Sequence, residues 1–270
     1  MTMSRILTSR AVPWIGGLVL VAGSCLAKTY ATRFPSTESP ISEGGNWKNG
    51  AADGMDWTDC RSSGGLIFGT ETGTRRNQYD DSTCILAGTW GPLQSVQATV
   101  FSRNQSSSYF QEVELRLHST LARHRCTGYE VLFRAYYPGG YATIVRWNGA
   151  LGSFTYLNQK ANASYKGIRT GDVVKASIDR NGLIIGYVND VEVIRAVDTT
   201  YTEGNPGVGF WLWARGGQGV GTNADYGFSQ FSATDTAMGG LNRVGQCQRG
   251  AGFSPRLAVA VAVWVVAGRA

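Results

Sequence analysis

Short runs of alternating apolar and polar residues, separated by glycine-rich turns, make up residues 35–235 of the chain. Apolar residues do not recur there at helical spacing over any long window, and period-two alternation places successive side chains on opposite faces of a strand. The pattern therefore predicts an all-β domain, built as a two-sheet antiparallel sandwich. The predicted strands are Leu66–Phe68, Ser95–Phe101, Gln111–Ser119, Gly128–Tyr136, Tyr141–Trp147, Asp172–Asp179, Leu183–Val188, Val191–Arg195, Gly207–Ala214 and Asp225–Thr234.

Turn residues separate several of these runs by only two or three positions. Pro138-Gly139-Gly140, Asn181-Gly182 and Asn189-Asp190 each stand between two predicted strands. Asn, Asp and Gly tolerate the positive φ angles of tight hairpin turns. Neighbouring strands are therefore expected to pair antiparallel.

The strand QEVELRLHS, residues 111–119, carries the most concentrated chemistry in the chain. Period-two alternation places Glu112, Glu114, Arg116 and His118 on one face and three apolar residues on the other. The same alternation groups polar residues on the next two predicted strands, so that one polar sheet face is expected across three strands. Its members are Glu112, Glu114, Arg116, Glu130, Arg134 and Arg146.

The two ends of the chain differ in character from its middle. Residues 1–10 are basic and residues 11–27 are apolar, with small residues after them, which is typical of a secretory signal peptide within residues 1–31. The VAGSC sequence that ends at Cys25 also fits a bacterial lipoprotein signal, in which Cys25 would be acylated. Residues 236–270 form a tail of unassigned role, whose apolar segment is shorter than the ~20 residues that span a bilayer. We therefore expect a secreted, extracellular or cell-envelope protein, in contact with a membrane only through its signal, a lipid anchor or this tail.

The net charge of +6 does not describe the domain. Residues 35–235 hold 17 Lys and Arg against all 19 Asp and Glu, and the basic excess lies in the two ends. A nucleic-acid-binding domain would carry its basic patch on the fold itself. No nucleic-acid partner is expected.

Four cysteines follow Cys25, namely Cys60, Cys84, Cys126 and Cys247. They allow three disulfide pairings, among which the sequence alone does not choose, although Cys60–Cys84 is favoured because both residues lie in the first third of the chain. The cysteines form no CxxC motif and no Cys/His cluster, so a zinc site is not expected.

The segments GDVVKASIDRNGLIIGYVNDVEVIRAVD (171–198) and EGNPGVGFW (203–211) resemble the second half of a concanavalin A-like jelly roll. LamG-type and lectin/glucanase-type domains share this order of strand, tight turn, strand, short hairpin strand and glycine-rich strand. The resemblance covers roughly residues 40–235 and implies a sheet face that meets carbohydrate. Because this superfamily includes lectins, binding modules, hydrolases and lyases, the fold does not decide the function.

Carbohydrate binding is the first hypothesis, since aromatic side chains stack on sugar rings and polar side chains bind their hydroxyl groups. The period-two pattern places Trp211 and Trp213 on one face, opposite Phe210 and Leu212. A polysaccharide or other glycan is the expected partner. The candidate ligand-binding residues are Glu112, Glu114, Glu130, Arg134, Arg146, Trp147, Trp211 and Trp213.

The strand 111–119 also suggests two enzymatic alternatives, and the sequence leaves open whether the chain is an enzyme. A laminarinase-like hydrolase would place its acids as Glu-x-Asp-x-x-Glu, but here Glu114 replaces the middle acid and Leu117 the third. The favoured enzymatic hypothesis is a polysaccharide lyase that acts by β-elimination on a uronate-containing glycan. An arginine would neutralise the uronate, and a histidine and a tyrosine would transfer protons. The candidate catalytic residues are Arg116, His118, Tyr136 and Tyr141.

The polar sheet face and the acidic loops each allow one further interpretation. The polar face can be an ordinary solvated face of an antiparallel sheet, in a structural surface protein without a glycan site. Calcium prefers oxygen ligands from acidic loops, and the sequence offers two such loops, which are equally consistent with ordinary turn residues. The candidate calcium ligands are Asp53, Asp56, Asp59, Asp80 and Asp81.

Overall fold

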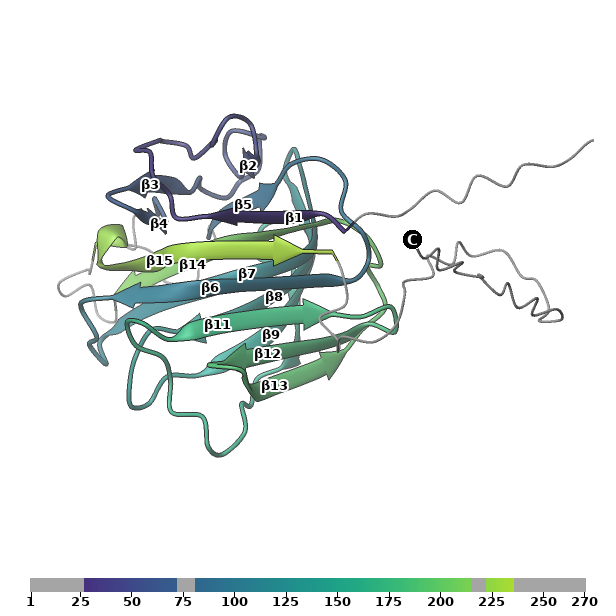
Figure 1. The fold of residues 1–270 in the computed structure, drawn as a ribbon. Helices are drawn as coiled ribbons and strands as arrows, with labels where there is room; N and C mark the ends of the chain where they lie inside the picture. Colours follow the sequence, from purple (N-terminus) through teal and green to yellow (C-terminus); the bar gives the residue numbers. More distant parts are fainter. Residues whose placement is uncertain (1–26, 72–80, 215–221, 236–270) are drawn as a thin grey trace, which may run out of the picture. The chain divides into compact units, whose positions relative to one another are not determined.

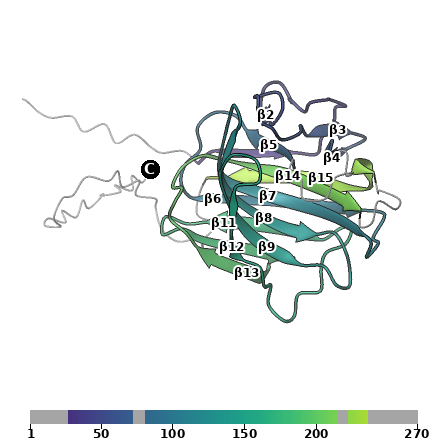
Figure 2. The same cartoon turned by 180° about the vertical axis from the view of Figure 1, so that it is seen from behind.

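The computed structural model describes residues 27–71, 81–214 and 222–235, which fold into two stacked antiparallel sheets (Figures 1 and 2). The predicted two-sheet all-β sandwich is confirmed. The first sheet, sheet A, has eight strands in the order β13 (Val191–Val197), β12 (Leu183–Val188), β11 (Val173–Ile178), β6 (Gln94–Ser102), β15 (Tyr226–Thr234), β4 (Leu66–Phe68) and β3 (Arg61–Ser63), with β1 (Thr29–Thr32) also paired to β15. Sheet B has seven strands in the order β10 (Phe154–Asn158), β9 (Ala142–Gly149), β8 (Arg125–Arg134), β7 (Tyr109–Ala122), β14 (Asn205–Ala214), β5 (Ser82–Leu86) and β2 (Trp47–Asn49).

Each strand predicted from the sequence overlaps an observed strand, whereas β1, β2, β3, β5 and β10 were not predicted. The turn predictions hold where hairpins are tight. Asn189 and Asp190 both have positive φ angles, of 50° and 62°, in the two-residue turn that joins β12 to β13. Within the described ranges, the one helical element is the short 3₁₀ turn η2 (Asn223–Asp225).

The hydrophobic core lies between the two sheets. On β7 it receives Val113, Leu115 and Leu117, which alternate with the polar residues of the same strand and are fully buried. Phe210 on β14 is also fully buried and packs against Phe228 of sheet A with 5.4 Å between ring centroids. Since one face of sheet B is occupied by this core, its polar residues are presented on the opposite, outer face.

The structure bears on the cysteines and on the ends of the chain. Cys60, Cys84 and Cys126 are buried free thiols, so the favoured Cys60–Cys84 disulfide is not formed in this structure. Cys25, Cys247, most of the predicted signal segment and the tail lie outside the described residues. Residues 29–31 of the predicted signal segment lie in β1, which pairs with β15. Among the described residues no helix is long and apolar enough to cross a membrane.

Candidate functional site

The strand register of sheet B brings the predicted acidic and basic residues together on its outer face. Glu112 on β7 lies opposite Arg134 on β8, and Arg116 lies opposite Glu130. These charged side chains are not solvated, because Glu112, Glu114, Arg116, Glu130 and Arg134 are all buried and Arg116 is fully inaccessible. The expectation of an ordinary wet face is therefore wrong, and the reason is that other parts of the chain cover it.

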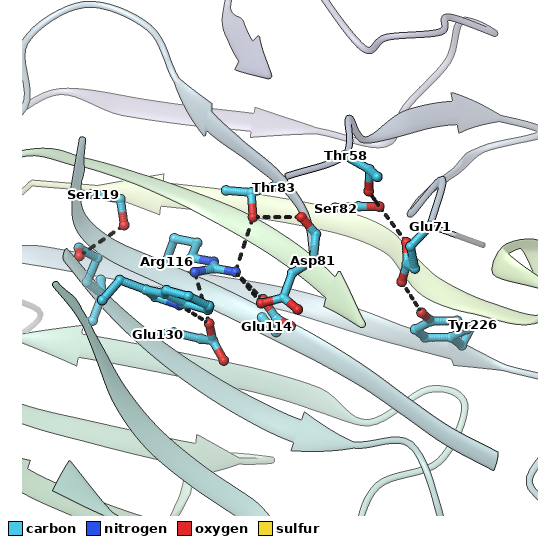
Figure 3. Close-up of polar contacts among 12 residues, drawn as sticks. Thr58, Glu71, Asp81, Ser82, Thr83, Glu114, Arg116, Ser119, Glu130 and Tyr226 are labelled. Atoms are coloured by element: carbon cyan, nitrogen blue, oxygen red, sulfur yellow. Dashed lines mark hydrogen bonds and ion pairs between the residues drawn. The ribbon is translucent and has the colours of Figure 1, made fainter. Parts of the chain in front are cut away.

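Arg116 is the centre of a buried ionic cluster (Figure 3). Its Nη2 atom lies 2.5 Å from Glu114 Oε2, 3.4 Å from Asp81 Oδ2 and 3.2 Å from Thr83 Oγ1. Its Nη1 atom lies 2.9 Å from Glu130 Oε2. One guanidinium therefore joins three carboxylates, and their negative charge holds the pKa of Arg116 above its usual range despite the opposing effect of burial.

A loop and an indole ring cover this cluster. Trp147 on β9 donates its Nε1–H to Glu130 Oε2 at 2.6 Å, and the Arg116 guanidinium lies 5.7 Å from the centre of the Trp147 ring. Trp57, in the loop that follows β2, packs edge-on against Trp147 with 5.3 Å between ring centroids, and Met55 of the same loop joins this apolar cluster. The loop is held to the β7–β8 hairpin by a hydrogen bond from His124 N to Gly54 O.

Gly209 on β14 leaves the space that the cluster needs. It lies opposite Glu114 in the β14–β7 register. A Cβ atom at this position would lie 2.1 Å from Glu114 Oε2 and 2.8 Å from Arg116 Nη2. A glycine is thus required here by the close approach of two charged side chains.

An open groove of about 480 Å³ lies beside the cluster on the same outer face. Its lining comes from five consecutive strands, β10, β9, β8, β7 and β14, together with Asp81 just before β5. Four inter-strand steps of ~4.8 Å give this path a length of about 19 Å. We call it the sheet-B groove, and it is lined by Asp81, Phe110, Glu112, Glu130, Leu132, Tyr141, Thr143, Val145, Trp147, Phe154, Tyr156, Gln159, Trp211 and Trp213.

Aromatic side chains form both ends of the sheet-B groove. On β7 and β14, Phe110 lies 4.9 Å from Trp213, and Trp211 and Trp213 are stacked with 6.3 Å between centroids. On β9 and β10, Phe154 contacts Trp147 and Tyr156 edge-on, at 5.3 Å and 5.1 Å. Tyr156 is half exposed. The floor between the two aromatic ends carries the carboxyl groups.

Glu112, on the floor of the groove, has an altered acidity. Burial raises its pKa to about 8, and the nearby carboxylate of Glu130 adds to the effect; the hydrogen bond from the Tyr141 hydroxyl to Glu112 Oε1 and the charge of Arg134 oppose it. Burial and the neighbouring carboxyl groups also raise the pKa values of Asp81 and Glu114 well above the ordinary range, against the lowering effect of Arg116. At neutral pH, Glu112 is therefore a proton-bearing acid in an accessible groove.

Arg134 belongs to the edge of the groove rather than to its floor. Its guanidinium donates to the carbonyl oxygens of Ser107 and Tyr109 at 2.9 and 3.0 Å. It also lies 4.2 Å from the centre of the Phe110 ring and 5.0 Å from that of Tyr136. Tyr136 thus packs on Arg134 and does not line the groove.

His118 does not share a site with Arg116. The register between β7 and β8 shifts after Leu117, and His118 has a positive φ angle of 48°. This irregularity turns its ring toward Tyr129, 6.2 Å away, with the two ring nitrogens 2.9 Å from the carbonyl oxygens of Tyr201 and Pro92. The four candidate lyase residues therefore do not converge, since of these four only Tyr141 lines the groove.

Arg146 lies on the opposite face from the one expected. It pairs with Tyr129 in the β8–β9 register, while Val145 and Trp147 on either side of it line the groove. Its guanidinium lies 2.6 Å from Asp198 Oδ2 and 2.8 Å from Thr200 Oγ1. Its role is to tie the sheet to the loop after β13.

The candidate calcium ligands do not form one group. Asp53 and Asp56 are exposed, Asp56 bonds His124 at 2.8 Å, and Asp59 accepts a hydrogen bond from Ala52 N, while Asp80 lies outside the described residues. Among the described residues, the carboxyl groups that approach one another as metal ligands do are those of Asp81, Glu114 and Glu130, within 4.8 Å. The guanidinium of Arg116 already bonds all three, so a calcium ion does not fit this cluster.

Several groove residues were missed in the sequence. Phe110 was missed because β7 begins at Tyr109, two residues before the predicted strand, although the period-two pattern extended by one step would have placed it beside Glu112. Phe154 and Tyr156 were missed because β10 is short and was not predicted. The covering loop with Met55 and Trp57 has no local signal, because its position depends on contacts distant in sequence.

The fold and groove together define a class, a two-sheet β-sandwich with an aromatic-ended, acid-floored groove across one sheet. No protein-family model matches the chain, and no curated protein matches it. Solved structures similar to it include the carbohydrate-binding module CBM66 from Bacillus subtilis, with 13% identity, 72% of this chain and 95% of that chain covered and a TM-score of 0.46. A GlcNAcα1-4Gal-releasing endo-β-galactosidase from Clostridium perfringens has 8% identity, coverages of 84% and 66% and a TM-score of 0.49.

The potassium-bound carbohydrate recognition domain of Emp46p has 10% identity, coverages of 76% and 95% and a TM-score of 0.46. By their names, these similar structures are carbohydrate-binding and glycan-cleaving proteins. Similarity at this level carries no information about the ligand of this chain, which has to be inferred from the groove itself.

Proposed function

We propose that this chain is a carbohydrate-binding domain, and that its ligand is an oligosaccharide that lies across the strands of sheet B in the groove. The observation that carries the proposal is the pair of aromatic ends, Phe110–Trp211–Trp213 and Trp147–Phe154–Tyr156, separated by a polar floor. Aromatic rings offer flat apolar surfaces to the C–H faces of sugar rings, and the carboxyl and hydroxyl groups between them bind sugar hydroxyl groups. A path of about 19 Å across five strands suits a chain of several sugars rather than one.

The proposal is tested with a panel of soluble and insoluble polysaccharides. The full chain is run through affinity gels that contain each soluble polymer and is mixed with each insoluble one, and retardation or depletion is measured. We expect at least one glycan to retain the chain and an excess of the matching oligosaccharide to release it. Retention by no glycan would contradict the proposal and would favour the interpretation as a structural surface protein.

A second candidate function, hydrolysis of the bound glycan, is favoured by one specific observation. Glu112 keeps its proton at neutral pH, whereas Glu130, which lines the same groove, is paired with Arg116. Two carboxyl groups in different environments are what acid-assisted glycoside cleavage requires. The uronate-lyase alternative has less support, because Arg116 is buried and His118 faces elsewhere.

The same panel separates these enzymatic functions. Hydrolysis would release new reducing ends without ultraviolet absorbance, and lyase action would release an unsaturated, absorbing product. Binding without either product would leave carbohydrate binding as the function and would contradict both enzymatic alternatives.

A further inference from the structure

The titratable residues that line the described sheet-B groove with carboxyl groups have no basic counterpart among the lining residues. Asp81, Glu112 and Glu130 contribute its titratable carboxyl groups, and no Lys, Arg or His is present among the described residues that line it. When these carboxyl groups are ionised, they repel anionic glycans such as uronate polymers. They then also attract positive charge, because a pocket with low-dielectric walls concentrates the field of carboxylates.

Arg116 and Arg134 neutralise only part of this surplus. Arg116 is shared among three carboxylates, and Glu114 Oε1 still lacks a hydrogen-bond partner although Glu114 is almost completely buried. The Nη2 atom of Arg134 donates its hydrogen bonds to the carbonyl oxygens of Ser107 and Tyr109. Within the described part of the chain, four carboxyl groups are buried at this face, of which three form ion pairs with the Arg116 guanidinium and Glu112 forms none.

The folded chain reduces the surplus of negative charge because some of these carboxyl groups keep their protons. Burial is the main reason why the pKa of Glu112 rises to about 8, and the pKa values of Asp81 and Glu114 rise with it. A cation bound in the groove would supply the missing positive charge and would allow a carboxyl group to ionise. Binding and proton release are then linked.

The aromatic ends suit a cation as well as a sugar ring. Indole and phenol faces attract ammonium groups within about 6 Å, with Trp the strongest. Trp211 and Trp213 lie on one side of the Glu112 carboxyl group, and Trp147 lies on the other, bonded to Glu130. An ammonium group on a sugar in the middle of the groove would meet carboxylates below it and aromatic rings beside it.

We propose that the sheet-B groove is selective for glycans that carry a protonated amine, that is, for polymers of amino sugars without N-acetyl groups. The inference rests on the proposed carbohydrate-binding function and names the class of ligand for the same groove. The amine supplies the charge that Arg116 does not, and acidic glycans are excluded.

The test is a calorimetric titration of the full chain at about pH 5.5, where the amine of an amino sugar already carries its proton, with four β-1,4-linked tetramers that differ only in their substituents. They are the glucosamine tetramer, its fully N-acetylated form, cellotetraose and the glucuronate tetramer. We expect the glucosamine tetramer to bind roughly tenfold or more tightly than cellotetraose or the N-acetylated form. The glucuronate tetramer should bind most weakly, and added salt should reduce the preference for the amine.

Two variants connect the preference to the groove. Titrations in buffers of different ionisation enthalpy should show net proton release when the glucosamine tetramer binds, and Glu112→Gln should abolish that release. Glu192→Gln is the matched control, because Glu192 is paired with Arg195 on strand β13 of sheet A, outside the groove. It should leave both the preference and the proton release unchanged.

Failure of this inference is distinguishable from failure of the proposed function. If the glucosamine tetramer binds no more tightly than cellotetraose while any panel glycan retains the chain, the amine selectivity is wrong and carbohydrate binding stands. Tightest binding of the glucuronate tetramer would also overturn the selectivity. If neither the tetramers nor the panel binds, both proposals fall.

Discussion

Arg116 and Glu130 face each other across β7 and β8, with Nη1 2.9 Å from Oε2, and both are buried beneath Trp147 and the loop that carries Trp57. Replacing one partner of an ion pair buried in this way lowers the stability of the fold strongly, because the charge of the other partner stays buried without a counter-charge. The outer face of sheet B therefore depends on this pair for its stability.

Replacing Arg116 tests that dependence. Arg116→Met should lower the free energy of unfolding by about 3–5 kcal/mol, because it leaves three buried carboxyl groups without their cation. Urea denaturation at pH 7 measures the change. Arg195→Met is the matched control, since Arg195 pairs with Glu192 at the surface, and it should leave the midpoint nearly unchanged. Equal effects of the two substitutions would show that the buried cluster has no special role.

Gly209→Ala addresses the space that the cluster requires. The new Cβ would lie 2.1 Å from Glu114 Oε2, so strand β14 or the ion pair must move, at a cost of about 1–3 kcal/mol. Gly91→Ala is the control, because the nearest atom to its Cβ would be the Asp235 carboxylate at 3.3 Å. A thermal melt of each variant provides the measurement, and an unchanged transition in Gly209→Ala would refute the close approach of Glu114 to Gly209.

Stability should also depend on pH through Glu112. Its pKa is raised from an ordinary 4.5 to about 8 in the folded chain, so between these values the folded chain binds a proton that the unfolded chain does not. This contribution is complete below pH 4.5 and is lost as the pH rises toward 8. Unfolding free energies measured between pH 5 and 8 should fall by about 1.4 kcal/mol per pH unit for this group. Glu112→Gln should remove that part of the slope, and an unaltered slope would mean that Glu112 is ionised in the folded chain.

The groove aromatics should control glycan affinity without controlling folding. Trp213→Ala and Tyr156→Ala, one at each end of the groove, should each weaken binding of the best-retained glycan roughly tenfold, because each removes a stacking surface. Tyr137→Ala is the control, since Tyr137 is an exposed aromatic residue outside the groove. Affinity electrophoresis of the three variants compares them directly. Loss of binding in Tyr137→Ala but not in the other two would place the site elsewhere.

The sequence predicted the fold class and the polar face because both depend on local alternation. Glu112, Glu114, Arg116 and Glu130 share a face, and Trp211 and Trp213 share the groove, as period two requires. His118 departs from the pattern because a register shift after Leu117 interrupts the alternation, which no local feature of the sequence reveals.

Other features depended on contacts between distant segments. Arg146 could be assigned to a face only once its pairing with Tyr129 was known. Burial of Arg116 depends on Trp57, which lies 59 residues earlier in the chain. Because the sequence does not show which loops cover a sheet, it predicted a polar face but could not distinguish a solvated face from a covered ionic cluster beside a groove.

A crystal structure of the chain with the best-retained oligosaccharide would show whether the glycan binds in the sheet-B groove. We expect sugar rings in contact with Trp213 at one end and Tyr156 at the other, with the chain of sugars crossing the strands above Glu112. An oligosaccharide bound on the outer face of sheet A, with the sheet-B groove empty, would contradict this expectation.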